Sequence, residues 1–375
     1  MYLALRELRF AKARYSLIAV IMLLVAFLVL FVTGLAKGLA YDNAASIQNQ
    51  AATHYLLEQG AEHRFTRSKV DASLLDQATA IVGEGKAEPF GLAMTTVIPK
   101  GMSQKLDVTL MGVNPAGWLA PQVVSGEGIA AASPSGTVLV DRKLADAGVK
   151  LGTVLVDQAS GLSWTVSGFV KNESFSHSAV VVMNLQDWAK LQAVKPAIGG
   201  AAGEGVRYSA VALQATKAQS EQLAAAFGGK AEFISKSDAV SAIPGYKEEQ
   251  GSLLMMIVFL FVISAFVLAV FFYVITIQKT SQFGILKAIG TRTRYLIQSV
   301  TLQVLVLAIG SLAISCAVVL ALAAVLPSGM PFQLTGATLT FTCLAFILMS
   351  VLGSLLSVWQ VVRVDALDAI GRSAA

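Results

Sequence analysis

Charge is scarce in this chain. Asp, Glu, Lys and Arg make up 14% of its 375 residues, whereas 55% of the residues are hydrophobic. Soluble domains carry about 25% charged residues, so this composition argues against an ordinary soluble protein and predicts membrane spans. The formal net charge of +5 does not indicate a nucleic-acid partner. Acidic residues outnumber basic ones in residues 41–251, and the basic excess lies in the segments that flank the apolar runs.

Residues that bind metals or act as nucleophiles are also rare. Both cysteines, Cys316 and Cys343, fall inside apolar runs, which excludes a secreted disulfide framework and predicts two small core residues. The three histidines, His54, His63 and His177, are scattered, and their spacing does not support a metal site. The sequence contains no G-x-S-x-G, H-E-x-x-H, C-x-x-C or Walker motif. We therefore expect a protein that is not an enzyme and has no intrinsic cofactor.

Long apolar runs, in contrast, are abundant. Four of them predict transmembrane helices at residues 16–40, 252–277, 296–326 and 339–362. Each is long enough for the roughly 20 residues that a helix needs to cross the hydrocarbon of a bilayer. The first contains SLIAVIMLLVAFLVLFVTGLA, which is too long for the apolar part of a signal peptide, and no small-residue cleavage site follows it closely. All four runs are therefore interpreted as spans.

The basic residues next to these runs predict the orientation of the chain. Short loops rich in Lys and Arg face the cytoplasm, so we expect a cytoplasmic elbow helix at 1–15, a cytoplasmic loop at 278–295 and a cytoplasmic tail at 363–375. Residues 41–251 and the uncharged loop 327–338 then lie outside the cell, and the protein belongs in the cell membrane. The basic residues concerned are Arg6, Arg9, Lys12, Arg14, Lys279, Lys287, Arg292, Arg294 and Arg363.

Residues 41–251 have the patterns of a mixed α/β domain. The stretch TVLVDRKLADAGVKLGTVLVD predicts a strand, a short helix and a second strand, and SAVVVMNLQDWAKL predicts a strand followed by a helix. The predicted fold class is thus a membrane α-helical protein with four transmembrane helices and cytoplasmic N and C termini. A large extracellular α/β (α+β) domain is inserted between the first and second helices.

Three segments and this architecture resemble a known superfamily over the whole chain. LALRELRFAKARYSL resembles its elbow helix, QKTSQFGILKAIGTRTRYLIQ its cytoplasmic coupling loop, and VVRVDALDAIG its C-terminal tail. The superfamily is that of the macrolide-exporter (MacB/FtsX-like) permeases of ATP-binding-cassette export systems. The chain departs from its usual pattern at Phe283, before Gly284, and at Ala366, where proline is usual.

A finer resemblance points to one branch of that superfamily. The stretches SHSAVVVMN, GYKEEQGSLLMM and the second apolar run resemble the permeases of Gram-positive heme exporters, the HrtB-type hemin permeases. This resemblance implies ATP-driven efflux of heme for detoxification, by a permease homodimer in membrane lipid with two cytoplasmic ATPase subunits that bind the ATP. Two alternatives stay open: a permease for a macrolide, peptide or lipoprotein, and a non-transporting mechanotransmitter that regulates cell-wall hydrolases.

The stretch FGILKAIG in the loop 278–295 is the predicted coupling site. Ile285, Leu286 and Ile289 form an apolar ridge that could enter a groove on a partner, and the glycines allow close approach. A membrane-surface helix held by lipid alone is the alternative. The superfamily resemblance assigns contact with the ATPase to eight residues, Phe283, Gly284, Ile285, Leu286, Lys287, Ala288, Ile289 and Gly290.

The start of the second span is the first candidate for a heme site. On a helix, Tyr246, Glu249 and Met256 fall on one face. A heme site needs apolar walls and a ligand for the iron. Tyr246 or Glu249 could supply an oxygen to the heme iron, and Met255 or Met256 a sulfur. The alternative is an ordinary belt of interfacial side chains at the membrane surface.

Two further sequence features are candidates for binding or packing. In FSHS, Phe175 could stack on a porphyrin and His177 could bind its iron, although a lone histidine beside a strand is more often structural. Gly34 and Gly38 form a small-x-x-x-small pair near the outer end of the first span. Such a pair allows close helix packing, including packing across a dimer.

Overall fold

The structure described here is a computed structural model of the chain, and it describes residues 12–129, 136–195, 205–327 and 329–363. The chain divides into two compact units. The membrane unit comprises Met1–Gly38, Gly251–Leu326 and Phe332–Ala375, and the outer domain comprises Leu39–Gln250 and Pro327–Pro331. Most of the predicted elbow helix and the C-terminal tail lie outside the described residues.

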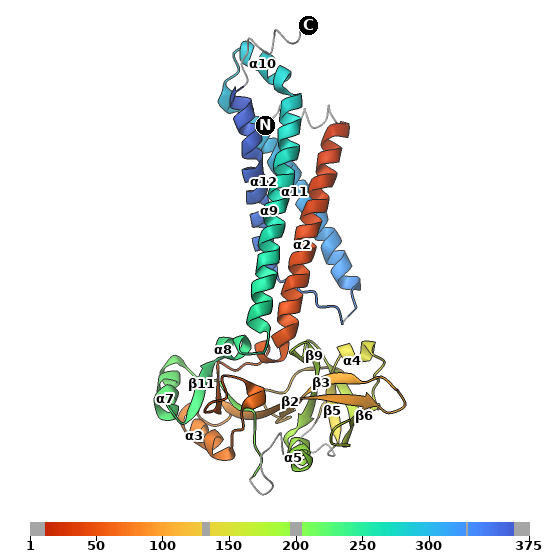
Figure 1. Ribbon diagram of the computed structural model, residues 1–375, viewed down its shortest axis with the longest axis vertical. Helices are drawn as coiled ribbons and strands as arrows, with labels where there is room; N and C mark the ends of the chain where they lie inside the picture. Colours follow the sequence, from red (N-terminus) through yellow and green to blue (C-terminus); the bar gives the residue numbers. More distant parts are fainter. Residues whose placement is uncertain (1–11, 130–135, 196–204, 328, 364–375) are drawn as a thin grey trace. The chain divides into compact units, whose positions relative to one another are not determined.

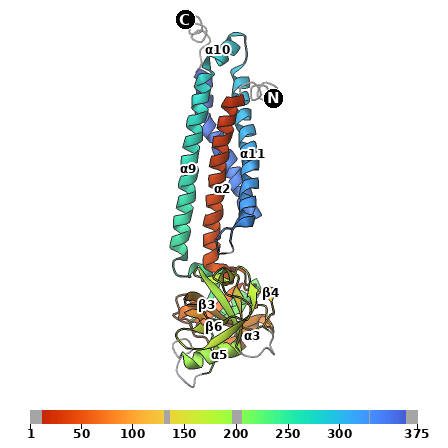
Figure 2. The same cartoon turned by 90° about the vertical axis from the view of Figure 1, so that its right-hand side faces the viewer.

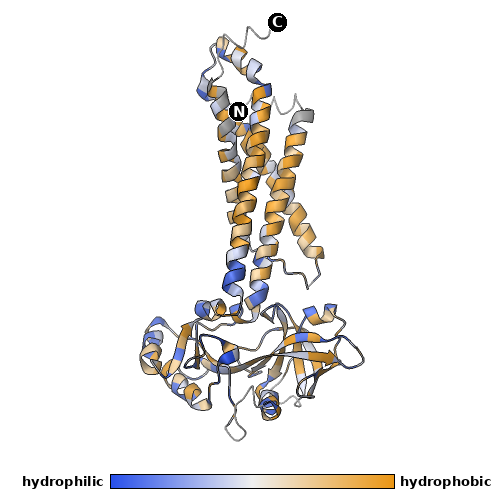
Figure 3. Cartoon of the chain, viewed as in Figure 1, coloured by the Kyte–Doolittle hydropathy of each residue, from blue (hydrophilic) through white to orange (hydrophobic). Residues whose placement is uncertain are grey.

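Among the described residues, four helices are long and apolar enough to cross a membrane, as the sequence predicts (Figure 1). Figure 3 shows that apolar residues dominate their length. Helices α2 and α9 continue past the apolar runs, because polar residues such as Asp42 and Glu249 extend the helical pattern. The four are α2 (Lys12–Gln48), α9 (Tyr246–Gln278), α11 (Thr293–Val325) and α12 (Gly336–Arg363). The cytoplasmic location of both termini stays a prediction.

The core of the membrane unit combines apolar packing with short polar contacts. Met22 and Leu30 of α2 and Phe346 of α12 are fully buried in one apolar cluster. The hydroxyl of Ser315 in α11 donates a hydrogen bond of 2.9 Å to the carbonyl of Leu23 in α2. Small and hydroxyl-bearing residues let helices approach closely and pair their polar atoms in an apolar medium.

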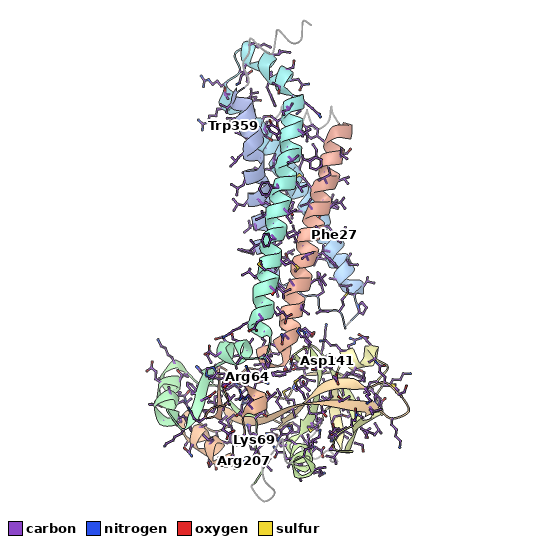
Figure 4. The ribbon with its side chains drawn as sticks, in the orientation of Figure 1. Phe27, Arg64, Lys69, Asp141, Arg207 and Trp359 are labelled. Atoms are coloured by element: carbon purple, nitrogen blue, oxygen red, sulfur yellow. The ribbon has the colours of Figure 1, made fainter. Side chains whose placement is uncertain are left out.

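Aromatic residues also contribute to packing within this unit. Phe27, labelled on α2 in Figure 4, stacks on Phe31 with ring centroids 5.6 Å apart. Phe31 in turn stacks on Phe332, which precedes α12. The chain segment before α12 is thus packed against α2.

In its described residues, the outer domain is built on an 11-stranded sheet in the order β11-β1-β10-β2-β3-β9-β5-β7-β4, with β6 and β8 beside it. The pairs β3–β9 and β5–β7 are parallel, and the other pairs are antiparallel. The strands are β1 (His54–Glu58), β2 (Ala87–Pro99), β3 (Leu106–Val113), β4 (Val123–Gly126), β5 (Thr137–Asp141), β6 (Val154–Asp157), β7 (Ser163–Val170), β8 (Ser174–Phe175), β9 (Ser178–Asn184), β10 (Ala210–Leu213) and β11 (Ala231–Ser235).

Short helices cover this sheet, and their caps are visible in the sequence. Asp71, Asn184 and Ser235 each accept a backbone N–H at a helix start, and Thr216 forms a capping box with Gln219. Figure 2 shows α5 beneath the strands. The helices are η1 (Phe65–Arg67), α3 (Ala72–Val82), α4 (Lys143–Asp146), α5 (Leu185–Val194), α7 (Lys217–Phe227) and α8 (Lys236–Ser241). The predicted mixed α/β insert is confirmed.

One helix reaches the sheet only because two strand positions lack side chains. Trp188 of α5 is buried, and a Cβ atom on Gly91 of β2 would lie 2.0 Å from its ring. A Cβ atom on Gly112 of β3 would lie 2.7 Å from the Trp188 side chain. The indole N–H donates a 3.0 Å hydrogen bond to the carbonyl of Arg207. The adjacent glycines therefore form the socket for this tryptophan.

Candidate functional site

The outer domain brings the last turns of α2 against the first turn of α9. The side-chain amide of Asn43 donates a 2.6 Å hydrogen bond to Oε2 of Glu249. The side-chain amide of Gln48 donates a 3.4 Å hydrogen bond to the hydroxyl of Tyr246. Two predicted site residues, Tyr246 and Glu249, are thus held by residues that immediately follow the first apolar run.

A strained hairpin turn brings His177 to the same place. Strands β8 and β9 pair Phe175 with Ser178, which leaves Ser176 and His177 as a two-residue turn. Both residues have left-handed backbones, with φ of 49° and 62°. Such turns usually contain Asn-Gly or Gly, because other side chains are disfavoured at positive φ. A hydrogen bond of 2.8 Å from the N–H of Ser176 to the carbonyl of Asn43 holds the turn in place.

The imidazole of His177 lies between two carboxylates. Its Nε2 is 3.1 Å from Oε2 of Glu249, and its Nδ1 is 3.6 Å from Oδ2 of Asp42. Lys143 forms an ion pair with Asp42, and the hydroxyl of Ser174 donates a 2.9 Å hydrogen bond to Oδ1 of the same residue. We refer to Asp42, Asn43, Lys143, His177 and Glu249 as the carboxylate–histidine cluster.

Two acceptor atoms of this cluster remain available. Oε1 of Glu249 and Oδ1 of Asn43 are buried and accept no hydrogen bond from the described residues. Buried oxygens are normally paired, so each such atom in a folded protein requires an explanation. The second oxygen of Glu249 is therefore unsatisfied, and a Lewis acid would reach it only after the side chains that cover it move.

Buried acids surround the cluster. Asp141, which ends β5 and is labelled in Figure 4, accepts hydrogen bonds from the backbone N–H groups of Lys143 and Glu173. Burial raises the pKa of the Asp141 carboxyl. Burial also raises the pKa of the Glu173 carboxyl to about 8, and the charge of Asp141 adds to the rise against an opposing hydrogen bond from Asn49. Carboxyl groups outnumber basic side chains here, so the region offers oxygen donors and no basic surface for an anion.

The raised pKa of Glu173 predicts a pH-dependent stability. The unfolded chain releases this proton near pH 4.5, whereas the folded chain retains it until about pH 8, so the stability contributed by the protonated carboxyl is lost as the pH rises through that window. The expected loss is on the order of 4 kcal/mol. Glu173→Gln is expected to remove this dependence and to raise the melting temperature of the full chain in detergent at pH 8. The exposed Glu221→Gln is the control. A wild-type protein that melts at the same temperature at pH 5 and pH 8 would contradict the assignment.

The other residues predicted to bind heme lie outside the carboxylate–histidine cluster. Phe175 is 2% exposed and packs against Phe65 in the core, so its ring offers no free face for stacking on a porphyrin. Tyr246 is partly buried against the same core. Met255 and Met256 belong to the membrane unit, where they are 58% and 43% exposed. Of the predicted heme residues, Glu249 and His177 are therefore in direct contact, and Tyr246 lies one helical turn before Glu249.

Sequence reasoning missed three members of the cluster. Asp42 and Asn43 follow the first span as closely as Glu249 precedes the second, and antiparallel neighbouring helices bring such positions together. That signal could have identified both residues. Lys143 could not have been found, because only the sheet topology brings α4 near α2.

The cluster is not a site for a free metal ion. Among the described residues, no group of three or more His, Cys, Asp or Glu side chains has an arrangement that could hold a metal. The two nitrogens of His177 face different carboxylates, so these groups do not converge on one point. This geometry is compatible with a ligand that already holds its own metal ion and needs only one protein atom to complete the coordination of that ion.

The predicted coupling stretch spans most of helix α10 (Thr280–Ala288), its C-cap Ile289 and the following Gly290, and its residues face in two directions. Phe283 and Gly284 are buried, and Phe283 packs against Leu296 and Val300 of α11. Ile285 and Ile289 are 44% and 76% exposed. The eight predicted residues therefore divide into an inward side that fixes α10 to the bundle and an outward apolar ridge. Leu286 and Lys287 are half-buried, and Ala288 and Gly290 are exposed.

The predicted packing glycine Gly34 has a partner within the same chain. A Cβ atom at Gly34 would lie 2.4 Å from the ring of Phe332, and the carbonyl of Gly34 accepts a 3.0 Å hydrogen bond from the N–H of Gln333. Gly38 is also buried. Gly34 thus admits an aromatic side chain from the segment before α12, whereas packing across a dimer stays a prediction.

Filling this contact is expected to destabilise the membrane unit. Gly34→Val should cost about 1–3 kcal/mol, because the added methyl groups overlap the Phe332 ring. The melting temperature of the full chain in detergent measures the loss. Gly310→Val in α11 is the control, since nothing lies within 4 Å of a Cβ atom there. If Phe332→Ala does not restore stability to the Gly34→Val variant, the loss does not come from this contact.

Comparison with known proteins identifies the family to which this chain belongs. The family model of the FtsX-like permease C-terminal region matches residues 254–366, which comprise the last three apolar helices. The chain is 31% identical to a candidate hemin transport system permease protein, HrtB, of Staphylococcus haemolyticus over 371 residues, or 99% of both chains. It is 30% identical to the corresponding HrtB protein of Staphylococcus epidermidis over 371 residues, again 99% of both chains. The chain therefore belongs to the HrtB family of FtsX-like permeases.

Solved structures align with about half of this chain at lower similarity. The periplasmic region of MacB from Actinobacillus actinomycetemcomitans aligns with a TM-score of 0.36 and 11% identity, covering 50% of this chain and 89% of that one. The extracellular domain of the transporter YknZ from Gram-positive bacteria aligns with a TM-score of 0.34 and 14% identity, covering 49% of this chain and 98% of that one.

Family membership establishes the general role of the chain. It is a multi-pass protein of the cell membrane and the permease subunit of an ATP-binding-cassette transporter. It is not itself an enzyme, because ATP hydrolysis lies in a separate ATPase subunit.

Proposed function

We propose that this permease exports heme, and that the carboxylate–histidine cluster binds the heme iron. The single observation that carries the proposal is the free Oε1 of Glu249 beside His177 in an acidic setting. Ferric heme is a flat apolar ring whose iron is positively charged and accepts one or two axial ligands. A carboxylate oxygen meets that requirement without a complete metal site. The HrtB relatives, which are named for hemin transport, support the same cargo.

Glu249 is the preferred ligand among the predicted residues. Its Oε2 is already engaged by Asn43 and His177, which orient the carboxylate, and its Oε1 accepts nothing from the described residues. Tyr246 is one turn earlier, and its hydroxyl accepts a hydrogen bond from Gln48. His177 is 41% exposed at its side chain and could serve as a second ligand after releasing Glu249.

The proposed transport cycle assigns a different role to each unit. ATP binding and hydrolysis in two partner ATPase subunits would move α10 through its exposed ridge of Ile285 and Ile289. Residues of the membrane unit would pass that movement along the spans, and the cluster would release heme when its geometry changes. A homodimer of the permease would complete the transporter. Heme enters as cargo, so no cofactor is permanently held.

A hemin titration tests the cargo. The visible absorption spectrum of the purified permease in lipid nanodiscs is expected to show a saturable Soret shift upon addition of hemin. Nanodiscs without protein are the control for hemin partitioning into lipid. A shift no greater than in empty nanodiscs would remove heme as the cargo, and a macrolide, peptide or lipoprotein would then be the next candidates.

A deletion strain separates transport from mechanotransmission. An exporter predicts growth that is sensitive to added hemin and restored by the wild-type gene. A regulator of cell-wall hydrolases predicts instead altered cell division or wall structure with unchanged hemin tolerance. The second phenotype would overturn heme export even if the protein bound hemin in vitro.

A further inference from the structure

The two cysteines of the chain meet inside the membrane unit. Cys316 lies on α11 and Cys343 on α12, and their Sγ atoms are 3.7 Å apart. Both are free thiols and partly buried. The sequence predicted two small core residues, and nothing in the local pattern indicates that two positions with 26 residues between them would meet. The packing of α11 against α12 is what aligns them.

The surroundings of the pair decide which reagents can reach it. Both cysteines pack against the apolar cluster that contains Leu312 and Phe346, within helices long and apolar enough to cross a membrane. Charged, water-soluble oxidants are excluded from such a medium by their desolvation cost. Neutral organic hydroperoxides, including those of lipids, dissolve in it. Partial exposure of both side chains gives such a molecule access from the lipid.

We propose that Cys316 and Cys343 are a modification site that reacts with organic hydroperoxides and forms a reversible disulfide between α11 and α12. One thiol first attacks the hydroperoxide, which gives a sulfenic acid and releases the corresponding alcohol. The second thiol then attacks the sulfenic sulfur, so that the S–S bond forms and water leaves. The two thiols lose two electrons and two protons in total, and the hydroperoxide is reduced to alcohol and water.

The short distance favours a disulfide over further oxidation. An isolated sulfenic acid proceeds to sulfinic acid, which most systems cannot reverse, unless a nearby thiol captures it. Here the second sulfur is already at contact distance, so capture is intramolecular and its effective concentration is high. An S–S bond of about 2.05 Å requires the two sulfurs to approach from the 3.7 Å at which they lie. The product would fix the relative position of α11 and α12.

The proposal is connected to the proposed function only through the source of the oxidant. Heme iron in a membrane promotes lipid peroxidation, so an exporter of heme would work where hydroperoxides form. The reaction of the thiol pair itself requires neither heme nor the ATPase. Failure of heme binding would therefore leave the thiol chemistry intact, and failure of the thiol chemistry would leave heme export intact.

The test uses the full chain in lipid nanodiscs treated with cumene hydroperoxide. Because the chain has two cysteines, an internal disulfide can only join Cys316 to Cys343. The wild type is expected to lose both maleimide-reactive thiols together after denaturation, to lose the mass of two hydrogens, and to recover both thiols upon reduction. Cys316→Ser and Cys343→Ser are expected to gain oxygen at the remaining thiol and to show no loss of hydrogen.

Other results would overturn the proposal. Two thiols that stay fully reactive after treatment would show that the pair is not a reaction site. Oxygen addition to the wild type at the same rate as to the single-cysteine variants would show that the second thiol does not capture the sulfenic acid. A disulfide found only between two copies on a non-reducing gel would place the reaction between chains.

Discussion

Replacing Glu249 by glutamine is expected to weaken hemin binding about tenfold or more, which corresponds to about 1.4 kcal/mol or more. The change keeps the size of the side chain and its ability to accept the hydrogen bond from Asn43. It removes the negative charge with which a carboxylate stabilises a ferric centre more strongly than a neutral amide oxygen does. The dissociation constant from the Soret titration measures the effect, and hemin tolerance of cells that carry the variant reports on export.

One variant is a control for this result, and a second tests the alternative ligand. Glu248→Gln changes the same charge at the neighbouring exposed position and is expected to leave hemin affinity within about twofold of the wild type. His177→Ala tests whether the imidazole supports Glu249 or binds iron itself. An affinity for hemin that is unchanged in Glu249→Gln would exclude Glu249 as the ligand, and loss in His177→Ala alone would transfer that role to the histidine.

Placing a charge on the exposed ridge of α10 is expected to have the second large effect. Ile289→Glu should reduce association with the ATPase by about 2 kcal/mol or more, or roughly 30-fold, because it puts an unpaired carboxylate into an apolar contact. The side chain is 76% exposed in the permease alone, so the variant should fold normally. Co-purification of the ATPase with the tagged permease measures association, and ATP hydrolysis by the purified complex measures coupling.

The control for Ile289→Glu is the same type of change at another exposed apolar residue. Val124 of β4 is 50% exposed in the outer domain, and Val124→Glu is expected to leave ATPase association unchanged. Normal co-purification with Ile289→Glu would show that the ridge does not contact the ATPase. Helix α10 would then be better explained as a membrane-surface helix.

The sequence was sufficient for the architecture because each span is defined locally. A run of about 20 apolar residues has one stable arrangement in a bilayer, so the four helices could be located without knowledge of their neighbours. The helix bounds were less predictable. Polar residues at the ends of α2 and α9 continue the helices beyond their apolar parts, and hydropathy alone does not detect that continuation.

The candidate site was predictable only in part, because its members are distant in the sequence. Glu249 and His177 were both proposed as ligands, yet their separation of 3.1 Å depends on a hairpin turn and on the ends of two helices. Phe175 was predicted to stack on a porphyrin, whereas its ring is buried against Phe65 in the core, a long-range contact that the local sequence does not reveal. The same limitation applies to α10, where helical periodicity decided that Phe283 faces inward and Ile289 outward.

The turn at Ser176 and His177 has a consequence for the evolution of this chain. Two non-glycine residues at positive φ reduce stability relative to Asn-Gly, the pair that such a turn favours. Selection for stability alone would therefore replace His177, and with it the only imidazole of the cluster. Under the proposed function, His177 in that conformation represents a trade-off, in which a less stable turn is tolerated in exchange for an imidazole beside Glu249. Thermostabilised variants of this permease should therefore be checked for hemin tolerance whenever they change this turn.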